Sequence, residues 1–252
     1  MKALTNQIAI VTGAGSGIGK AIARLFAEEG AKLILSDIRH ENIEAVAAEI
    51  KINGGTAFCF PADVSKKKDV DLLIDHTLKT YGRLDILVNN AGIMDNFAPV
   101  AEVTDKLWDN VIGTNLTGAF YTSRVATKLF LEQQNGNIIN IASIAGLTGG
   151  RAGCAYTVSK HALIGLTKSI GYQYADKGIR CNAIAPGGIN TNILHDVEFN
   201  PFGFDRMNAG SSNMPSSGEP EDIAAIALFL ASEKSKFMNG AVVTADGGWT
   251  AY

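Results

Sequence analysis

The sequence contains few cysteines. Only three occur in 252 residues, at Cys59, Cys154 and Cys181, and they lie far apart. None belongs to a Cys-x-x-Cys pair or to a Cys/His group with the spacing of a metal site. An odd number of widely spaced cysteines also differs from the disulfide frameworks of small secreted domains. We therefore expect a reducing, cytoplasmic location and no metal centre.

Long apolar runs are missing too. The longest, which ends at Ala231, is far shorter than the roughly 20 residues that cross a bilayer. The first seven residues turn polar at once, so we expect no signal peptide. Charge of one sign is not in excess, because 22 basic and 25 acidic residues leave a net charge of −3. Nucleic-acid binding relies on basic patches, so we expect neither a membrane nor a nucleic-acid partner.

The composition is that of a folded chain with unusually many glycines. Hydrophobic residues make up 46% and charged residues 19%, and there are 27 glycines, about 11% against a usual ~7%. A chain of this length can bury about three-quarters of its unfolded surface without a disulfide or a metal. We expect one domain over residues 1–252, because α/β folds often reach this size as a single unit.

Short β-branched runs alternate with helical patterns along the chain. Such alternation is typical of βαβ units, in which a parallel sheet is covered by helices on both faces. The fold class is therefore α/β, a doubly wound Rossmann-like domain with about seven parallel strands. The predicted strands are 7–11, 32–36, 56–60, 86–89, 137–141, 179–185 and 241–245, and the predicted helices are 18–29, 42–51, 67–81, 105–133, 155–175 and 220–231.

One segment interrupts this alternation. Residues 191–218 are rich in Asn, Ser, Gly, Pro and Phe. A long loop in a compact domain is usually a lid or a binding loop, so this segment is the predicted substrate lid. Three phenylalanines in it, Phe199, Phe202 and Phe204, either cover an apolar substrate or pack in the core or at a subunit contact.

A glycine-rich turn joins the first strand to the first helix. It reads Thr-Gly-Ala-Gly-Ser-Gly-Ile-Gly over residues 12–19. Glycines there allow a tight turn and a close approach of the backbone to a pyrophosphate, and the helix N-terminus offers N–H groups to that anion. The motif is weak alone, but a strand before it and a helix after it are the context that dinucleotide binding needs.

The second strand ends near a carboxylate that bears on the choice of cofactor. Asp37 lies about 20 residues after the turn, where a carboxylate can accept a hydrogen bond from the adenosine ribose and repel a 2′-phosphate. Arg39 could instead accommodate that phosphate, and Ser16 adds no basic group. We expect NAD rather than NADP. A helix-capping role for Asp37 is the alternative.

Tyr156 and Lys160 are four residues apart on a predicted helix and so share one face. An ammonium beside a phenol favours the phenolate and lowers the pKa of the phenol, which would make Tyr156 a general acid/base. Ser143 follows the fifth strand, at the edge where open α/β sheets place ligands. It could hydrogen-bond a substrate oxygen, although a serine there is also a common turn cap.

Taken together, these motifs resemble the short-chain dehydrogenase/reductase family over the whole chain. Their order and spacing are those of the ~250-residue branch. The motifs are the glycine turn 12–19, Asp63-Val64, the Asn-Asn-Ala-Gly run 89–92, Asn115, Ser143, Tyr156-xxx-Lys160, the Pro-Gly-Gly-Ile-Asn-Thr run 186–191 and the Asp-Gly-Gly run 246–248.

The resemblance implies a role for each matching residue. Tyr156 would be the general acid/base, Lys160 would lower its pKa and hold the nicotinamide ribose, and Ser143 would orient the substrate oxygen. Asn115 would hold a water that relays protons from Lys160, and Asn89 would brace the neighbouring strand. The cofactor would be bound by Tyr156 and Lys160 together with the remaining residues: Gly13, Ser16, Gly17, Ile18, Gly19, Asp37, Asp63, Val64, Asn90, Ile189 and Thr191.

The expected function is reversible hydride transfer between NAD and a secondary alcohol or ketone. A small-molecule substrate and a homo-oligomer, most often a tetramer in this family, are the expected partners. One alternative is an NADPH-dependent 3-oxoacyl-carrier-protein reductase, which Asp37 disfavours. The other is a non-catalytic dinucleotide-binding sensor, which could dispense with the tyrosine or the lysine. The sequence does not distinguish a steroid from a small cyclic alcohol, a sugar derivative or an acyl thioester.

Overall fold

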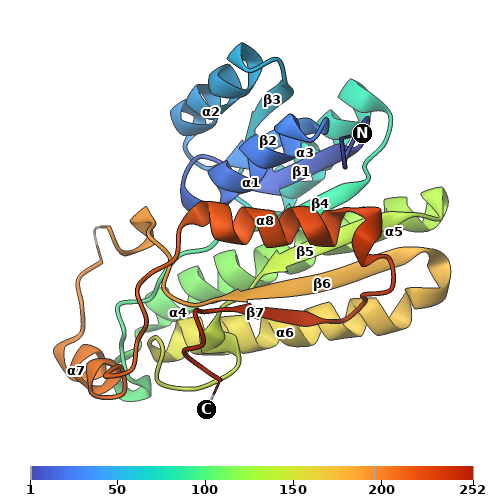
Figure 1. The fold of residues 1–252 in the computed structure, drawn as a ribbon. Coiled ribbons are helices and arrows are strands. Elements are labelled where there is room, and N and C mark those ends of the chain that lie inside the picture. Colours follow the sequence, from blue (N-terminus) through green and yellow to red (C-terminus); the bar gives the residue numbers. More distant parts are fainter. Residues whose placement is uncertain (1, 196, 252) are drawn as a thin grey trace.

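A computed structural model describes residues 2–195 and 197–251. Its strands form one parallel sheet in the order β3-β2-β1-β4-β5-β6-β7 (Figure 1), which confirms the predicted doubly wound sheet. The bounds differ from the predicted ones by at most two residues. The strands are β1 Ile8–Thr12, β2 Lys32–Asp37, β3 Thr56–Pro61, β4 Ile86–Asn89, β5 Gly136–Ile141, β6 Ile179–Pro186 and β7 Val242–Ala245.

The central strands are apolar because both of their faces are buried. In β1 the side chains alternate: Ala9 and Val11 pack in one core cluster, and Ile10 packs in the cluster on the opposite face. All three are fully buried. Full burial of a side chain the size of Val or Ile contributes roughly 1.5–3 kcal/mol, so this alternation holds the sheet between two layers of helices.

Helices α1, α2 and α8 cover one face of the sheet, and α3, α5 and α6 cover the other. Figure 1 shows α8 beside α1, with α7 set apart from both layers near one end of the sheet. The helices are α1 Gly17–Glu28, α2 His40–Ile52, α3 Lys67–Tyr81, α4 Asp105–Ile112, α5 Ala119–Gln133, α6 Cys154–Gln173, α7 Pro201–Ala209 and α8 Pro220–Ala231. No helix of the described residues is both long and apolar enough to cross a membrane.

Residues 105–133 are helical throughout, as predicted, but they do not form one regular α-helix. Between α4 and α5, residues Gly113–Gly118 form a wide π-helical turn. Gly118 packs against Val64 so closely that a Cβ there would lie 2.7 Å from the valine Cγ2. Such π turns occur often at functional sites, and this one contains Asn115.

The segment 191–218 was expected to be a loop, and that expectation is partly wrong. It contains α7, Pro201–Ala209. Asn200 caps this helix, with its side chain accepting from the Gly203 N–H at 2.9 Å, and Pro201 occupies the first turn. An Asn cap followed by Pro is a start signal for a helix; the abundance of polar and glycine residues concealed it.

The sheet order changes direction between β1 and β4. The chain builds outward from β1 through β2 to β3, then returns to add β4 on the other side of β1. The loops that follow β1 and β4 therefore diverge at the carboxyl ends of the strands. In open α/β sheets such a point leaves a crevice in which ligands bind.

Candidate functional site

A cleft of about 610 Å³ opens at this change of direction. The glycine turn, the end of β2, the loop after β3, the loop after β4 and the start of the 191–218 segment line it. Nine of the predicted cofactor residues are among the lining residues: Gly13, Ser16, Gly17, Ile18, Asp37, Asp63, Val64, Asn90 and Thr191.

The glycine turn presents backbone, not side chains, to the cleft. Gly13 has φ +63°, and a Cβ on it would lie 2.9 Å from the Ala91 Cα. A Cβ on Gly19 would meet the Gly13 carbonyl oxygen and the Asn90 amide. Ser16 precedes α1 without a side-chain cap, and the first turn of α1 has no acidic residue. Its open N–H groups therefore suit the pyrophosphate of a dinucleotide.

The Asp37 carboxylate lies at the same turn. Its Oδ2 accepts a hydrogen bond from the Gly15 N–H at 3.1 Å, and its Oδ1 accepts from the Arg39 N–H at 3.0 Å. Arg39 is exposed. Asp63 also lines this end, with Oδ1 accepting from the N–H and hydroxyl of Ser65. Two carboxylates therefore face the part of the cleft that would hold an adenosine.

Two neighbouring asparagines at the end of β4 form hydrogen bonds with different parts of the structure. The Asn90 amide donates to the carbonyls of Thr12 and Gly13, both at 3.0 Å, which ties the loop after β4 to the glycine turn. Asn89 is buried and donates to Asn140 on β5 at 2.8 Å, while its carbonyl accepts from Thr122 on α5 at 2.6 Å. Asn89 thus joins β4 to its neighbouring strand and to the helix above.

The far end of the cleft begins at Thr191. A Cβ on Gly17 would lie 3.1 Å from the Thr191 Cγ2, so the threonine faces the first turn of α1. Ile189 pairs with Gly218 and packs against the core. The lining residues beyond Thr191 combine apolar side chains, which include Ile93, Met94 and Ile193, with the polar Asn192 and His195.

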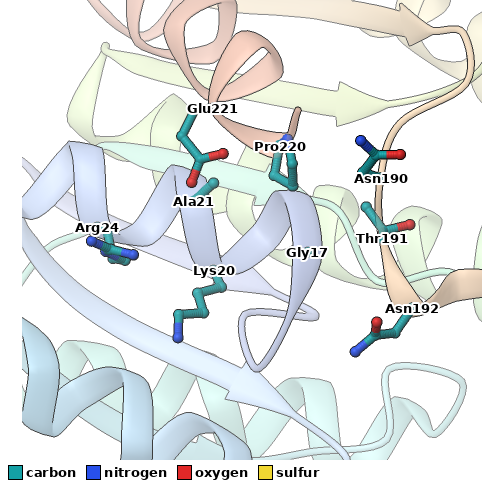
Figure 2. Close-up of a pocket in the computed structure, with 9 residues that line it drawn as sticks. All are labelled: Gly17, Lys20, Ala21, Arg24, Asn190, Thr191, Asn192, Pro220 and Glu221. Carbon is teal, nitrogen blue, oxygen red and sulfur yellow. The ribbon is translucent and has the colours of Figure 1, made fainter. Parts of the chain in front are cut away.

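A second, smaller cavity of about 190 Å³ adjoins the cleft between α1 and α8. It shares Gly17, Thr191 and Asn192 with the cleft. Figure 2 shows Thr191 and Asn192 across from the first turn of α1, with the start of α8 nearby. Lys20 on its rim pairs with Glu49 at 2.8 Å. This cavity therefore lies on the side of the glycine turn that faces α8.

Tyr156, Ser143 and Lys160 come together beside the cleft. Tyr156 is buried on α6, and the Ser143 side chain is close enough to lower the pKa of the phenol. Ser143 also accepts from the Ala145 N–H at 3.1 Å, so it caps a turn as well. Lys160 donates to the Ile141 carbonyl at 2.8 Å, with its Nζ 5.4 Å from the centroid of the Tyr156 ring.

The expected lowering of the Tyr156 pKa is not what the structure gives. Burial raises the pKa of Tyr156 to about 12, the bond with Ser143 lowers it, and the charge of Asp95 raises it. Burial also lowers the pKa of Lys160 to about 8. The difference arises because removing the phenol from water is the largest effect, and because the Lys160 ammonium donates to a carbonyl of β5.

Asn115 lies in the wide turn between α4 and α5 and is buried. Its Nδ2 donates to the Ile93 carbonyl at 3.0 Å and to the Ser159 hydroxyl at 3.1 Å, and its Oδ1 accepts from the Ile93 N–H at 2.8 Å. A Cβ on Gly92 would lie 3.4 Å from this Oδ1 and 3.6 Å from the Lys160 Nζ. The wide turn therefore brings Asn115 against Gly92 and Ile93, which line the cleft, and close to Lys160.

None of the three phenylalanines of the 191–218 segment is among the residues that line the cleft. Phe199 and Phe204 stack on each other with centroids 4.6 Å apart, and both contact the edge of Phe97. Phe97 is buried with φ +61°, and its carbonyl leaves no room for a side chain on Gly203. Residues 199–204 are therefore packed against the loop after β4, while Phe202 is exposed.

Sequence reasoning missed Asp95, a buried carboxylate that accepts hydrogen bonds from the start of α6. Its partners on α6 are about 60 residues further along the chain, so no local pattern reveals the contact. It also missed the wide turn, for which Gly113 and Gly118, on either side of Asn115, were the available signal.

Comparison with known proteins agrees with this geometry. The family model described as enoyl-(acyl carrier protein) reductase matches residues 13–250. The 3β-hydroxysteroid dehydrogenase 2 of Eggerthella lenta is 44% identical, over 99% of this chain and 96% of that protein. The cyclohexanol dehydrogenase of an Acinetobacter species is 35% identical, over 98% and 96% respectively.

A solved structure from Beutenbergia cavernae, with NADP bound at low occupancy, superposes with a TM-score of 0.88 at 36% identity and 99% coverage of both chains. Relatives of this similarity over nearly the whole chain, together with the family match, share the parallel sheet and the nicotinamide cofactor. The chain therefore belongs to the short-chain dehydrogenase/reductase family of nicotinamide-dependent oxidoreductases.

Proposed function

We propose that the protein transfers a hydride reversibly between NAD and a secondary alcohol or ketone, with Tyr156 as general acid/base. The observation that carries this proposal is the burial of Tyr156 and Lys160 side by side, with the Lys160 Nζ 5.4 Å from the centroid of the phenol ring. The dinucleotide supplies the hydride chemistry when bound. The protein supplies the proton and the orientation.

Each residue of this group has a distinct task. Tyr156 takes the alcohol proton at Oη during oxidation and returns it during reduction. Ser143 holds the substrate oxygen next to that Oη and favours the phenolate through its hydrogen bond. Lys160 places a positive charge beneath the ring. Both Nδ2 hydrogens of Asn115 are donated, to Ile93 and Ser159, and its part in a proton relay rests on the family resemblance alone.

Removal of the phenol oxygen of Tyr156 tests the mechanism. Tyr156→Phe should abolish turnover, by 10³-fold or more, and leave NADH affinity within about twofold, because the cofactor residues of the glycine turn are untouched. Purified wild type and variant would be titrated with NADH by fluorescence and assayed for NAD⁺ reduction with a 3β-hydroxysteroid or cyclohexanol. Unchanged turnover would remove Tyr156 from the mechanism.

NAD is favoured over NADP by the carboxylate at the end of β2. Asp37 lines the cleft with its Oδ2 3.1 Å from the Gly15 nitrogen, where an added phosphate would meet negative charge. The Beutenbergia cavernae structure holds NADP, and Arg39 is exposed beside the site, so the preference needs a direct test.

Separate titrations with NADH and NADPH provide that test. Wild type should bind NADH more tightly than NADPH. Asp37→Ala should reduce the ratio of the two affinities by roughly 10-fold, which corresponds to about 1.4 kcal/mol. A preference that survives the substitution would refute the role of Asp37. Preference of the wild type for NADPH would instead favour the 3-oxoacyl-carrier-protein reductase alternative.

The substrate that we propose is an apolar secondary alcohol on a ring. The far end of the cleft offers Ile93, Met94 and Ile193. Two relatives are named for such alcohols, a 3β-hydroxysteroid and cyclohexanol. A screen of NAD⁺ reduction with 3β-hydroxysteroids, cyclohexanol and a sugar alcohol would test this choice. Activity confined to the sugar alcohol would contradict it.

We further propose a single-domain, cytoplasmic homo-oligomer, with a tetramer favoured. Large apolar side chains are exposed at Trp108, Phe120 and Leu131, on α4 and α5, and at Phe237. Exposed apolar surface of this kind often marks an interface between proteins. Light scattering after gel filtration should give four times the 26.6 kDa chain mass. A monomer would refute the assembly.

A further inference from the structure

Asp95 is a carboxylate buried beside Tyr156 with no part in the chemistry described so far. It lies in the loop after β4 and is 0% exposed. Its Oδ1 accepts from the N–H groups of Phe97 at 3.1 Å and Gly153 at 3.0 Å, and its Oδ2 accepts from the Tyr156 N–H at 3.0 Å. None of the ion pairs among the described residues includes it. Backbone donors alone therefore hold a buried carboxylate in place.

Two of these donors belong to the start of α6. Gly153 is the N-cap residue, and Tyr156 is the third residue of the helix. The first N–H groups of a helix have no partner within the helix, and a capping side chain usually accepts one of them. Gly153 has no side chain that could do so. Asp95 takes this role from a loop 58 residues earlier in the chain, and its charge suits the positive end of the helix dipole.

The fit between loop and helix leaves no space for a local cap. A Cβ on Gly153 would lie 2.6 Å from the Asp95 Oδ1 and 2.7 Å from the Ala98 nitrogen. The Ala98 carbonyl in turn accepts from the Cys154 N–H at 3.0 Å. The first turn of α6 is therefore seated on residues 95–98 through several backbone contacts, with Asp95 at their centre.

We infer that Asp95 is a positioning residue, which caps α6 from a distance and thereby fixes Tyr156 relative to Ser143 and Lys160. The inference rests on the proposed role of Tyr156. The bond that Asp95 makes is to the main-chain nitrogen of Tyr156 itself, so loss of the cap frees the residue that carries the reactive oxygen. A misplacement of about 1 Å can lower a rate 10²-fold.

The charge of Asp95 has a second, separable effect. The groups that face the Tyr156 side chain are the Ser143 hydroxyl, the Lys160 ammonium and Asp95, and the charge of Asp95 raises the pKa of the phenol. Loss of that charge lowers the pKa, so the midpoint of alcohol oxidation against pH moves to lower pH. If Tyr156 loses its position, the plateau value of kcat above the midpoint falls instead. One pH profile therefore separates the two effects.

Asp95→Asn is the sharpest variant. An asparagine in the same rotamer keeps Oδ1 for Phe97 and Gly153 but turns an N–H₂ group toward the Tyr156 N–H, where two donors oppose each other. Asp95→Ser is the second variant and is needed if Asp95→Asn does not fold. The smaller serine side chain does not force two hydrogen-bond donors against each other. Asp85→Asn is the control at another buried carboxylate: Asp85 is 2% exposed, accepts from the Ile8 N–H at 2.8 Å at the opposite end of the sheet, and also pairs with Arg83.

Two readouts are needed, one with substrate and one without. The first is the pH profile of kcat for NAD⁺ reduction with a 3β-hydroxysteroid or cyclohexanol, beside NADH affinity by fluorescence. The second is hydrogen–deuterium exchange of the peptide over residues 153–160, which needs no substrate. Asp95→Asn should lower the kcat plateau by about 10- to 100-fold, move the midpoint to lower pH, speed exchange at the start of α6 and leave NADH affinity within about twofold.

Three results would overturn the inference. These are an unchanged kcat plateau in both Asp95 variants, unchanged exchange over residues 153–160, or equal losses of kcat in Asp95→Asn and Asp85→Asn. Tyr156→Phe, assayed in parallel, keeps the two proposals apart. If that variant retains turnover, the proposed function fails, whereas an inactive Tyr156→Phe beside a fully active Asp95→Asn refutes only the positioning role.

Discussion

Lys160 is only 3% exposed, and its ammonium donates a hydrogen bond to the Ile141 carbonyl. Burial lowers its pKa from 10.5 to about 8, a difference of about 2.5 pH units. Each pH unit is worth about 1.4 kcal/mol, so the folded protein holds this charge at a cost of about 3 kcal/mol at pH 7. Lys160→Met removes the charge and nearly preserves the volume of the side chain.

The expected gain in stability is smaller than that cost. The substitution leaves the Ile141 carbonyl without its donor, which costs about 1–3 kcal/mol. The net effect at pH 7 is a gain of roughly 0–2 kcal/mol, or up to about 8 °C in Tm for a domain of this size. Activity should fall by 10²-fold or more, because the charge beneath Tyr156 is lost. The variant should therefore be at least as stable as wild type and nearly inactive.

The lowered pKa of Lys160 also makes the stability of the protein depend on pH. Between pH 8 and 10.5 the unfolded chain binds a proton at Lys160 that the folded chain does not, so the contribution of Lys160 makes wild-type stability rise with pH in this window. Lys160→Met should lack that rise. Above pH 10 the raised pKa of Tyr156 acts in the opposite direction, because the unfolded phenol ionises first.

Urea unfolding at pH 7 and pH 9, at one fixed protein concentration, would measure these effects. Lys128→Met is the control, because Lys128 is exposed on α5 and an exposed substitution usually changes stability by less than about 0.5 kcal/mol. A Lys160→Met protein that is less stable than wild type by more than about 1 kcal/mol at pH 7 would show that the buried charge stabilises the fold.

Two further predictions concern the phenol and the glycine turn. Ser143 lowers the pKa of Tyr156, so Ser143→Ala should move the midpoint of alcohol oxidation to higher pH; a pH–rate profile with a lower midpoint would contradict this sign. Gly19→Ala should weaken NADH binding by more than about 10-fold in the fluorescence titration, because its Cβ would meet the Gly13 carbonyl oxygen. Gly165→Ala, where a Cβ on α6 meets nothing within 4 Å, is its control and should raise stability by about 0.5–1 kcal/mol; tight NADH binding by Gly19→Ala would refute the steric argument.

Elements with local signals were predicted well. The bounds of α3, β4 and α8 agree with the predicted ranges, because an apolar stripe, a glycine at +76° after α3 and a proline at the start of α8 are all legible in the sequence. The glycine turn and Asp37 were found for the same reason, since a strand and a helix frame them within about 30 residues.

Features that depend on distant contacts were not predictable in this way. The wide turn at Asn115 depends on how closely Gly118 approaches Val64, and the cap of α6 joins residues 58 and 61 positions apart. The sign of the Tyr156 shift was wrong because a sequence pattern shows which charges are neighbours but not how deeply they are buried. The spacing of two residues in the sequence shows that they are neighbours on a helix. How far their side chains are removed from water can be known only from the fold.

The contact between Phe97 and Gly203 has a consequence for protein engineering. Exchanging the 191–218 segment for that of a relative is an obvious route to new substrates. In this chain, however, the Phe97 carbonyl excludes a side chain at position 203, and the Phe97 ring holds Phe199 and Phe204. A working chimera must therefore transplant residues 96–98 together with the 191–218 segment, as one cassette taken from two separate stretches of the gene.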